Sequence, residues 1–229
     1  MSRVRGNLKV RHLEKVPTGR EGADLGAARR TVFIGVALMI GLLSGCRAAR
    51  PSNYYQLTVP SDAGAVEKAS AVPVTLLLGQ LMTSHLYRED RIVYGNGAER
   101  LGTYEYQRWA EPPTEMIQEV LLRELRSSGR YRAVHYRRSN MQGDFAIRGR
   151  LYDFKEVDGG QMSARVTLEL EMRDLKSGAT VWTHYYTHDE PASGKDVPAL
   201  VTALDKNVQR GVKEVVESLD QYFASHPVK

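Results

Sequence analysis

Apolar and polar positions recur with distinct periods along residues 72–224, and these periods predict several strands and two helices. Residues 164–174 have the clearest pattern. One set of positions is apolar and the other is polar: Ala164, Val166, Leu168, Leu170 and Met172 alternate with Arg165, Thr167, Glu169, Glu171 and Arg173. Such alternation is typical of a half-buried strand in an antiparallel sheet. The other predicted strands are residues 72–78, 91–94, 101–106, 131–136, 145–154 and 179–188.

Helical spacing of three and four residues appears in two segments, 114–128 and 197–224. We expect Thr114 to cap the first helix and Gly129 to end it. Its apolar stripe is Met116, Ile117, Val120, Leu121 and Leu125. The second stripe is Val197, Leu200, Val201, Leu204, Val208, Val212, Val215, Leu219 and Tyr222. One stripe on each helix and one apolar face on the sheet predict an α/β fold, a two-layer sandwich of a mostly antiparallel sheet with two main helices packed on one face.

Aromatic residues are concentrated in residues 94–113, from the end of the predicted strand 91–94 to the start of the first predicted helix. The segment contains Tyr94, Tyr104, Tyr106, Arg108, Trp109 and Pro112, and a Gly-Asn-Gly turn at 95–97. Tyrosine and tryptophan are enriched at protein interfaces, and polar residues separate them here. We therefore interpret these six residues as a partner-binding surface with Trp109 as its anchor. Ordinary core and rim packing of a hairpin is the competing interpretation, above all for Trp109.

The apolar run at residues 32–43 is shorter than the roughly 20 residues of a membrane-spanning helix. Two arginines, Arg29 and Arg30, precede it, which is the layout of a secretory signal. The run ends in Leu43, Ser44, Gly45 and Cys46, the lipobox pattern recognised by the lipoprotein signal peptidase. We predict that residues 1–45 are removed and that Cys46 carries the lipid. Export through the general secretory route and a twin-arginine route both stay open.

Composition changes once this segment is removed. The whole chain has 32 basic and 27 acidic residues, but residues 1–45 hold eight basic and three acidic ones, so 24 of each remain. A balanced charge does not favour nucleic acid as a partner. The single cysteine excludes an intrachain disulfide. We expect a lipidated tether at 46–71 and one periplasmic domain at 72–229.

Candidate catalytic groups are few. Glu169 and Glu171 share a strand face, but we interpret them as part of a solvated charge ladder rather than as an acid–base pair. His184 and His188 would share a face too, yet no third metal ligand follows, so we interpret them as exposed strand residues. Phosphate-loop and dinucleotide motifs are missing from the sequence. We therefore expect no enzyme, no cofactor and no metal site.

Two stretches resemble a known family. Residues 53–57 (Asn-Tyr-Tyr-Gln-Leu) follow the lipobox closely, and residues 91–94 precede residues 104–113, Tyr-Glu-Tyr-Gln-Arg-Trp-Ala-Glu-Pro-Pro, and an amphipathic helix. Together they are similar to the ABC-type transport auxiliary lipoproteins, the group that includes the paraquat-inducible lipoprotein. The resemblance covers about residues 46–222.

This resemblance implies a non-enzymatic accessory subunit of a mammalian-cell-entry (MCE) lipid transport system. Its partners would be an MCE-domain protein and the ABC transporter components, with the membrane contacted through the N-terminal lipid. A homo-oligomer is compatible with this arrangement. Arg47 stands where an aspartate would retain a lipoprotein in the inner membrane, so we expect the outer membrane. The alternatives are a module that itself binds a hydrophobic ligand in an apolar cavity and a periplasmic enzyme.

Overall fold

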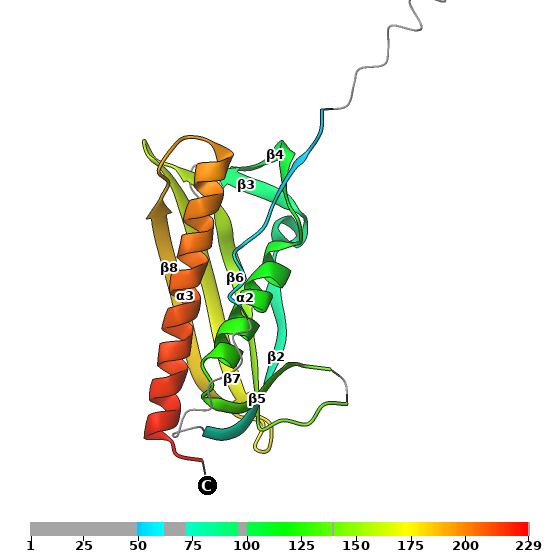
Figure 1. Cartoon of the computed structure of the whole chain (residues 1–229), viewed down its shortest axis with the longest axis vertical. Helices are drawn as coiled ribbons and strands as arrows, with labels where there is room; N and C mark the ends of the chain where they lie inside the picture. The colour runs from blue at the N-terminus through cyan, green and yellow to red at the C-terminus, as the bar shows by residue number, and fades with distance from the viewer. Residues whose placement is uncertain (1–49, 62–71, 96–99, 139, 229) are drawn as a thin grey trace, which may run out of the picture. The chain divides into compact units, whose positions relative to one another are not determined.

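Two helices lie against one face of a mixed eight-stranded sheet (Figure 1). The computed structural model describes residues 50–61, 72–95, 100–138 and 140–228, all within the unit Arg50–Lys229. The elements are β1 (Asn53–Tyr55), β2 (Val72–Thr83), the 3-10 helix η1 (His85–Arg88), β3 (Arg91–Gly95), β4 (Leu101–Trp109), α2 (Pro113–Ser127), β5 (Tyr131–Tyr136), β6 (Phe145–Asp158), β7 (Met162–Asp174), β8 (Thr180–Pro191) and α3 (Val197–Ser225). The predicted two-layer α/β architecture is confirmed.

The long strand β6 organises the sheet. Along one edge it pairs with β7, which pairs with β8, and both of these long ladders are antiparallel. Along its other edge β6 pairs with β2 in its first half and with β3 in its last residues, both in parallel. The β2–β5 and β1–β4 pairs are parallel as well, whereas β3 and β4 form the predicted antiparallel hairpin. The sheet is therefore more mixed than the periodicity alone suggested, although its longest ladders are antiparallel.

The alternation predicted for residues 164–174 is confirmed in β7. Leu168 is 2% exposed and lies in the core, while Glu169 is exposed on the opposite face. Thr167 is the exception on the polar face, because it is buried and its hydroxyl lies 2.9 Å from that of Thr187. Paired hydroxyls can satisfy each other across two strands.

Helix α2 begins one residue before the predicted cap. Pro112 occupies the N-cap position, and its carbonyl oxygen accepts from the backbone nitrogen of Glu115 at 2.9 Å. The prediction of Thr114 as the cap is therefore wrong, since Thr114 lies inside the first turn and is buried. Proline is tolerated at a helix start because its missing N–H would be unpaired there anyway.

A glutamine of α2 hydrogen-bonds to β2 at the point where the pairing of β2 with β6 is irregular. The register of β2 against β6 shifts between Leu78 and Leu81. Gln118 is buried opposite this point, donating to the carbonyl oxygen of Gly79 at 3.1 Å and accepting from the backbone nitrogen of Leu81 at 3.3 Å. Backbone groups freed by the shift are thus satisfied without water.

Part of the segment predicted to be a tether belongs to the domain. Tyr55 is in register with Trp109, and Leu57 is only 2% exposed. Thr58 is bound to α3, because its backbone nitrogen donates to Asp205 Oδ1 at 2.8 Å and its carbonyl oxygen accepts from Gln209 Nε2 at 2.7 Å. The expectation of a free tether is therefore wrong for these residues. Among the described residues no helix has the length and apolar character needed to cross a bilayer.

Candidate docking surface and a neighbouring cavity

The aromatic residues singled out in the sequence divide between two faces of β4. They lie on β1, β3 and β4, where Tyr94 pairs with Gly102 and Tyr54 pairs with Arg108. The register of β3 against β4 shifts between Arg91 and Val93, so Tyr104 shares the side of Tyr94, whereas Arg108 lies on the other side with Tyr54. We call this set, which occupies both sides of these strands, the tyrosine face: Tyr54, Tyr94, Tyr104, Tyr106 and Arg108. Tyr54 and Tyr94 are its most accessible members, at 63% and 42% exposed.

Tyr94 and Tyr104 pack edge to face, with ring centroids 5.1 Å apart and planes at 63°. Gly102 makes this possible, since a Cβ there would lie 2.5 Å from Cζ of Tyr94. Any larger residue at this position would displace the Tyr94 ring from the strand surface. The glycine therefore shapes the tyrosine face.

A nearly buried carboxylate lies below these rings. The hydroxyl of Tyr104 donates to Glu156 Oε2 at 2.5 Å, and Glu156 is 8% exposed. Burial, followed by this hydrogen bond, raises the pKa of Tyr104 above its usual range. Tyr104 is thus a neutral donor held in one orientation by Glu156.

Arginines border the rings on the other side. Arg108 donates to Asp90 Oδ1 at 2.8 Å, and Arg50 lies over the Tyr106 ring at 5.9 Å from its centroid. Guanidinium groups stack favourably on aromatic rings. A hydrogen bond to Glu105 raises the pKa of Tyr106. Arg50, the first of the described residues, therefore lies directly beside the tyrosine face.

Trp109 is not part of that surface. It lies on the side of β4 opposite Arg108, is 1% exposed, and its ring centroid is 5.2 Å from that of Phe154. The prediction of Trp109 as an exposed partner anchor is wrong, because the end of β4 is covered on that side by the core. Pro112 has a structural role at the start of α2, as described above. Leu43, Ser44, Gly45 and Cys46 lie outside the described residues.

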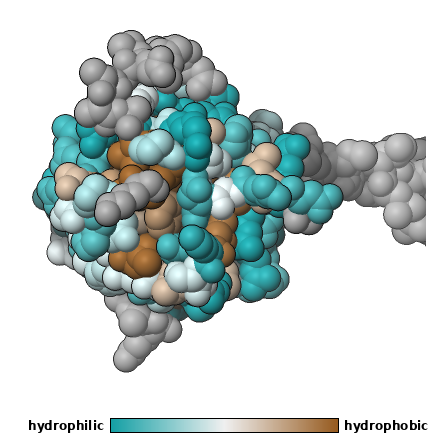
Figure 2. All heavy atoms as spheres, turned by 90° about the horizontal axis from the view of Figure 1, so that it is seen from below, coloured by the Kyte–Doolittle hydropathy of each residue, from teal (hydrophilic) through white to brown (hydrophobic). Residues whose placement is uncertain are grey.

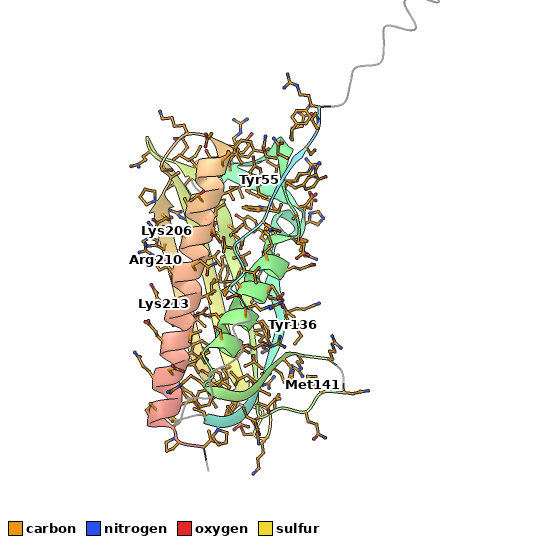
Figure 3. The ribbon with its side chains drawn as sticks, in the orientation of Figure 1. Tyr55, Tyr136, Met141, Lys206, Arg210 and Lys213 are labelled. Carbon is orange, nitrogen blue, oxygen red and sulfur yellow. The ribbon has the colours of Figure 1, made fainter. Side chains whose placement is uncertain are left out.

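A cavity of about 740 Å³ opens on the face of the sheet opposite the helices. Strands β2, β6 and β7 form its floor, and the β5–β6 loop forms one wall with Met141 (Figure 3). Its apolar lining is Leu77, Met82, Met141, Tyr152 and Leu175, and its charged lining is Arg137, Arg138, Arg148, Arg150, Glu169 and Glu171. Seen from below, this end of the molecule has apolar surface in its middle and polar residues around it (Figure 2).

Within the described residues, only some of the charged side chains of this cavity form ion pairs. Arg148 forms an ion pair with Glu171, and Glu169 accepts from the hydroxyl of Tyr152 at 2.8 Å. Arg150 lies over the Tyr152 ring at 5.6 Å. Glu171 thus pairs with a cation of the neighbouring strand, as in a charge ladder, whereas the hydrogen-bond partner of Glu169 is a neutral tyrosine.

The two histidines of β8 lie half-buried rather than exposed. His184 stacks on Trp182 with nearly parallel planes, and its Nε2 has no hydrogen-bond partner within the described part of the chain. His188 Nε2 lies 3.4 Å from Glu190. In residues 50–61, 72–95, 100–138 and 140–228, three or more metal-ligating side chains do not gather anywhere.

Sequence patterns also missed a buried charge. Glu190 of β8 is 4% exposed and is held by Lys206 and Arg210, both on α3 (Figure 3), with Arg210 Nη2 at 2.8 Å from Oε2. Hydrogen bonding to Lys206 lowers the pKa of Glu190. The spacing of Lys206 and Arg210, four residues apart on one helix face, was the only available signal.

Solved structures share this fold. A Xanthomonas campestris protein matches with a TM-score of 0.62 and 21% identity, over 72% of this chain and 92% of its own. A second, uncharacterised protein matches with a TM-score of 0.59 and 12% identity, over 74% of this chain and 99% of its own. At sequence identities of 21% and 12%, these matches show a shared fold only. A comparison with curated proteins gives no match.

The sequence of this chain also matches a family model. The match covers residues 55–216, from the strand β1 that the sequence placed in a tether to the middle of α3. It includes the β3–β4 hairpin, the tyrosine face except Tyr54, helix α2 and the part of α3 up to residue 216. The chain therefore belongs to the family of ABC-type transport auxiliary lipoprotein components.

Proposed function

We propose that this protein is a non-catalytic lipoprotein of the outer membrane that docks onto an MCE-type lipid transport system. Family membership supports an auxiliary role in transport. The observation that carries the docking role is the tyrosine face, where four tyrosines and an arginine gather on the neighbouring strands β1, β3 and β4. Exposed aromatic residues bordered by polar groups are typical of an interface before it is occupied.

Tyr54 and Tyr94 are the most exposed residues of this face. We propose that the MCE-domain protein covers them, with Tyr104 held in place below by Glu156. Replacing an interface anchor with alanine typically costs about 2 kcal/mol or more, roughly thirtyfold in affinity.

The docking test compares two tyrosine variants of the full lipidated chain. Tyr54→Ala combined with Tyr94→Ala should weaken co-purification with the MCE-domain partner while the melting curve stays near that of the wild type. Tyr185→Ala is the matched control, because Tyr185 is 62% exposed on β8, outside the tyrosine face. Normal recovery of the partner with the double variant would move the docking surface elsewhere.

The lipid anchor is proposed from the lipobox at residues 43–46. Cys46→Ser should abolish incorporation of a clickable fatty acid, and equal labelling of both proteins would refute the anchor. The outer-membrane location is proposed because Arg47 stands where an aspartate would retain a lipoprotein in the inner membrane. Density-gradient fractionation tests it, and recovery with inner-membrane markers would contradict it.

A second candidate function is that the domain itself holds a hydrophobic ligand. The cavity on the outer face of the sheet favours it, because its volume of about 740 Å³ falls within the range of small-molecule sites, roughly 300–1,000 Å³. The two functions are compatible, since the tyrosine face and the cavity share no residue.

A further inference from the structure

We propose that the cavity formed by β2, β6, β7 and the β5–β6 loop binds an anionic amphiphile with a single acyl chain. The acyl chain would lie on Met82 and Met141, beside the loop that covers Leu77, and a carboxylate or phosphate head would bind Arg137, Arg138 and Arg150. This inference rests on the second candidate function and names its ligand class.

The apolar part of the cavity is built by a close approach of the β5–β6 loop to β2. A Cβ at Gly143 would lie 2.6 Å from Cγ of Leu77, so only glycine lets the loop cover that leucine. Leu77 is 1% exposed although it lies on the sheet face away from the helices. Both ends of the loop are fixed by backbone hydrogen bonds to β2. The nitrogen of Arg137 donates to the carbonyl oxygen of Leu78 at 2.8 Å, and the nitrogen of Asp144 donates to that of Thr75 at 3.0 Å.

Two methionines then extend this apolar floor toward solvent. Met82 is 62% exposed and Met141 is 38% exposed. Methionine is flexible and polarizable, which suits it to surfaces that accept chains of varying shape. An acyl chain is the kind of group that covers adjoining exposed apolar side chains of this sort.

The charge of the cavity selects the head group. Arg148 is paired with Glu171, but Arg137, Arg138 and Arg150 form no ion pair within the described ranges. All three are exposed, and the remaining carboxylate, Glu169, already accepts from Tyr152. The cavity therefore offers an excess of guanidinium groups. Guanidinium groups bind carboxylates and phosphates through paired hydrogen bonds.

Size favours one acyl chain. A volume of about 740 Å³ is that of a site for a single small ligand. An acidic segment of a partner protein would satisfy the arginines as well, but it would not require the recess over Leu77. The combination of an apolar recess with arginines at its mouth fits an amphiphile better than a peptide.

Photo-crosslinking in membranes that contain the full chain tests this inference. Three diazirine probes are compared: a fatty acid, lysophosphatidylglycerol and lysophosphatidylcholine. We expect the two anionic probes to label the peptides that contain Met82 and Met141, roughly tenfold more than the zwitterionic probe. Labelling by only one of the anionic probes would identify the head group as carboxylate or phosphate and uphold the proposal.

Variants connect the labelling to the cavity. Met82→Glu should abolish it, since a carboxylate would enter the apolar floor, and Met82 is exposed enough for the fold to tolerate the change. Arg137→Gln with Arg138→Gln should reduce labelling by the anionic probes about tenfold. Arg88→Gln with Lys195→Gln is the matched control, because it removes the same charge at exposed positions outside the cavity.

Two results would overturn the inference in distinguishable ways. Equal labelling by lysophosphatidylcholine, unchanged by the arginine variant, would overturn the anionic ligand class while leaving a hydrophobic-ligand function in place. Absence of labelling at Met82 and Met141 with all three probes, or crosslinking of a partner protein there instead, would overturn both.

Discussion

The hydroxyl of Tyr186 on β8 donates to Asn207 Oδ1 on α3 at 2.6 Å, in the interior between the helix and the sheet. Asn207 is 0% exposed. Its amide nitrogen donates to the carbonyl oxygens of Ala164 and His188 at 2.7 and 2.8 Å. Burial raises the pKa of Tyr186 to about 12, so its hydroxyl stays a donor. One side chain of α3 thus holds β7 and β8 in register with the helix.

Replacing Asn207 with leucine should strongly destabilise the domain. The substitution leaves the carbonyl oxygens of Ala164 and His188 without this donor in a dry interior, and each unsatisfied buried group costs about 1–3 kcal/mol. The Tyr186 hydroxyl loses its shorter bond and keeps the backbone carbonyl oxygen of residue 207, at 3.1 Å. We expect a loss of about 2–5 kcal/mol in the free energy of unfolding, measured by urea denaturation. Tyr186→Phe is the control and should cost about 1 kcal/mol, because it removes a single donor. A loss below that of the control would show that water reaches the site.

Gly211 is required one turn further along α3. A Cβ there would lie 2.8 Å from Cε1 of Tyr186, so the helix and the strand touch through the glycine. Alanine normally stabilises a helix interior by about 1 kcal/mol relative to glycine. We expect the opposite sign for Gly211→Ala, a destabilisation of about 1–3 kcal/mol, because the Tyr186 ring must move. Thermal denaturation measures it, with the exposed Lys213→Ala as the matched helix control. A stabilised Gly211→Ala variant would contradict the close packing.

The roles of Asn207 and Gly211 could not be predicted from the sequence. The alternation in β7 and the stripes of α2 and α3 depend on burial, which repeats with a period that the sequence displays. Asn207 and Gly211 lie at α3 positions that the structure buries but that carry no apolar side chain, so periodicity says nothing about them. Their roles depend on which strand lies opposite, and a strand pattern shows a face but not its neighbours. For the same reason the parallel pairing of β2 with β5 and β6 was not predicted.

The docking surface was predicted in part. Alternation along β4 predicted one face for Tyr104 and Tyr106, but it could not reveal the register shift that puts Tyr104 and Arg108 on different sides of the strand. Aromatic density alone could not show that Trp109 is buried. The cavity was missed altogether, because its wall is a loop whose position depends on Gly143 and Asp144, and loops carry no periodic signal.

Trp109→Ala should unfold more readily rather than release a partner. A buried tryptophan replaced by alanine typically costs about 3–5 kcal/mol, since apolar contacts are lost and a cavity remains. We expect a much lower melting temperature. Tyr54→Ala is the control on the neighbouring strand and should change the free energy of unfolding by about 0.5 kcal/mol or less, because Tyr54 is 63% exposed. A Trp109→Ala variant that melts like the wild type would contradict its burial.

The ion pairs of Glu190 should make the stability of the domain depend on pH. Lys206, Arg210 and His188 surround this carboxylate, and the hydrogen bond to Lys206 is the main cause that lowers its pKa. A carboxyl whose pKa is lower in the folded than in the unfolded chain stabilises the fold above its unfolded pKa, about 4.3. That contribution is lost as the pH falls through the folded pKa. Glu190→Gln should therefore be less stable than the wild type at pH 7, and the difference should shrink as the pH falls below about 4. Urea denaturation at pH 7 and at pH 3 measures this difference.

Glu217→Gln is the control, because Glu217 is exposed on the same helix and lies 4.0 Å from Lys213. We expect that variant to follow the wild type at every pH. A constant difference between Glu190→Gln and the wild type from pH 7 to pH 3 would show that Glu190 contributes through packing and not through its charge.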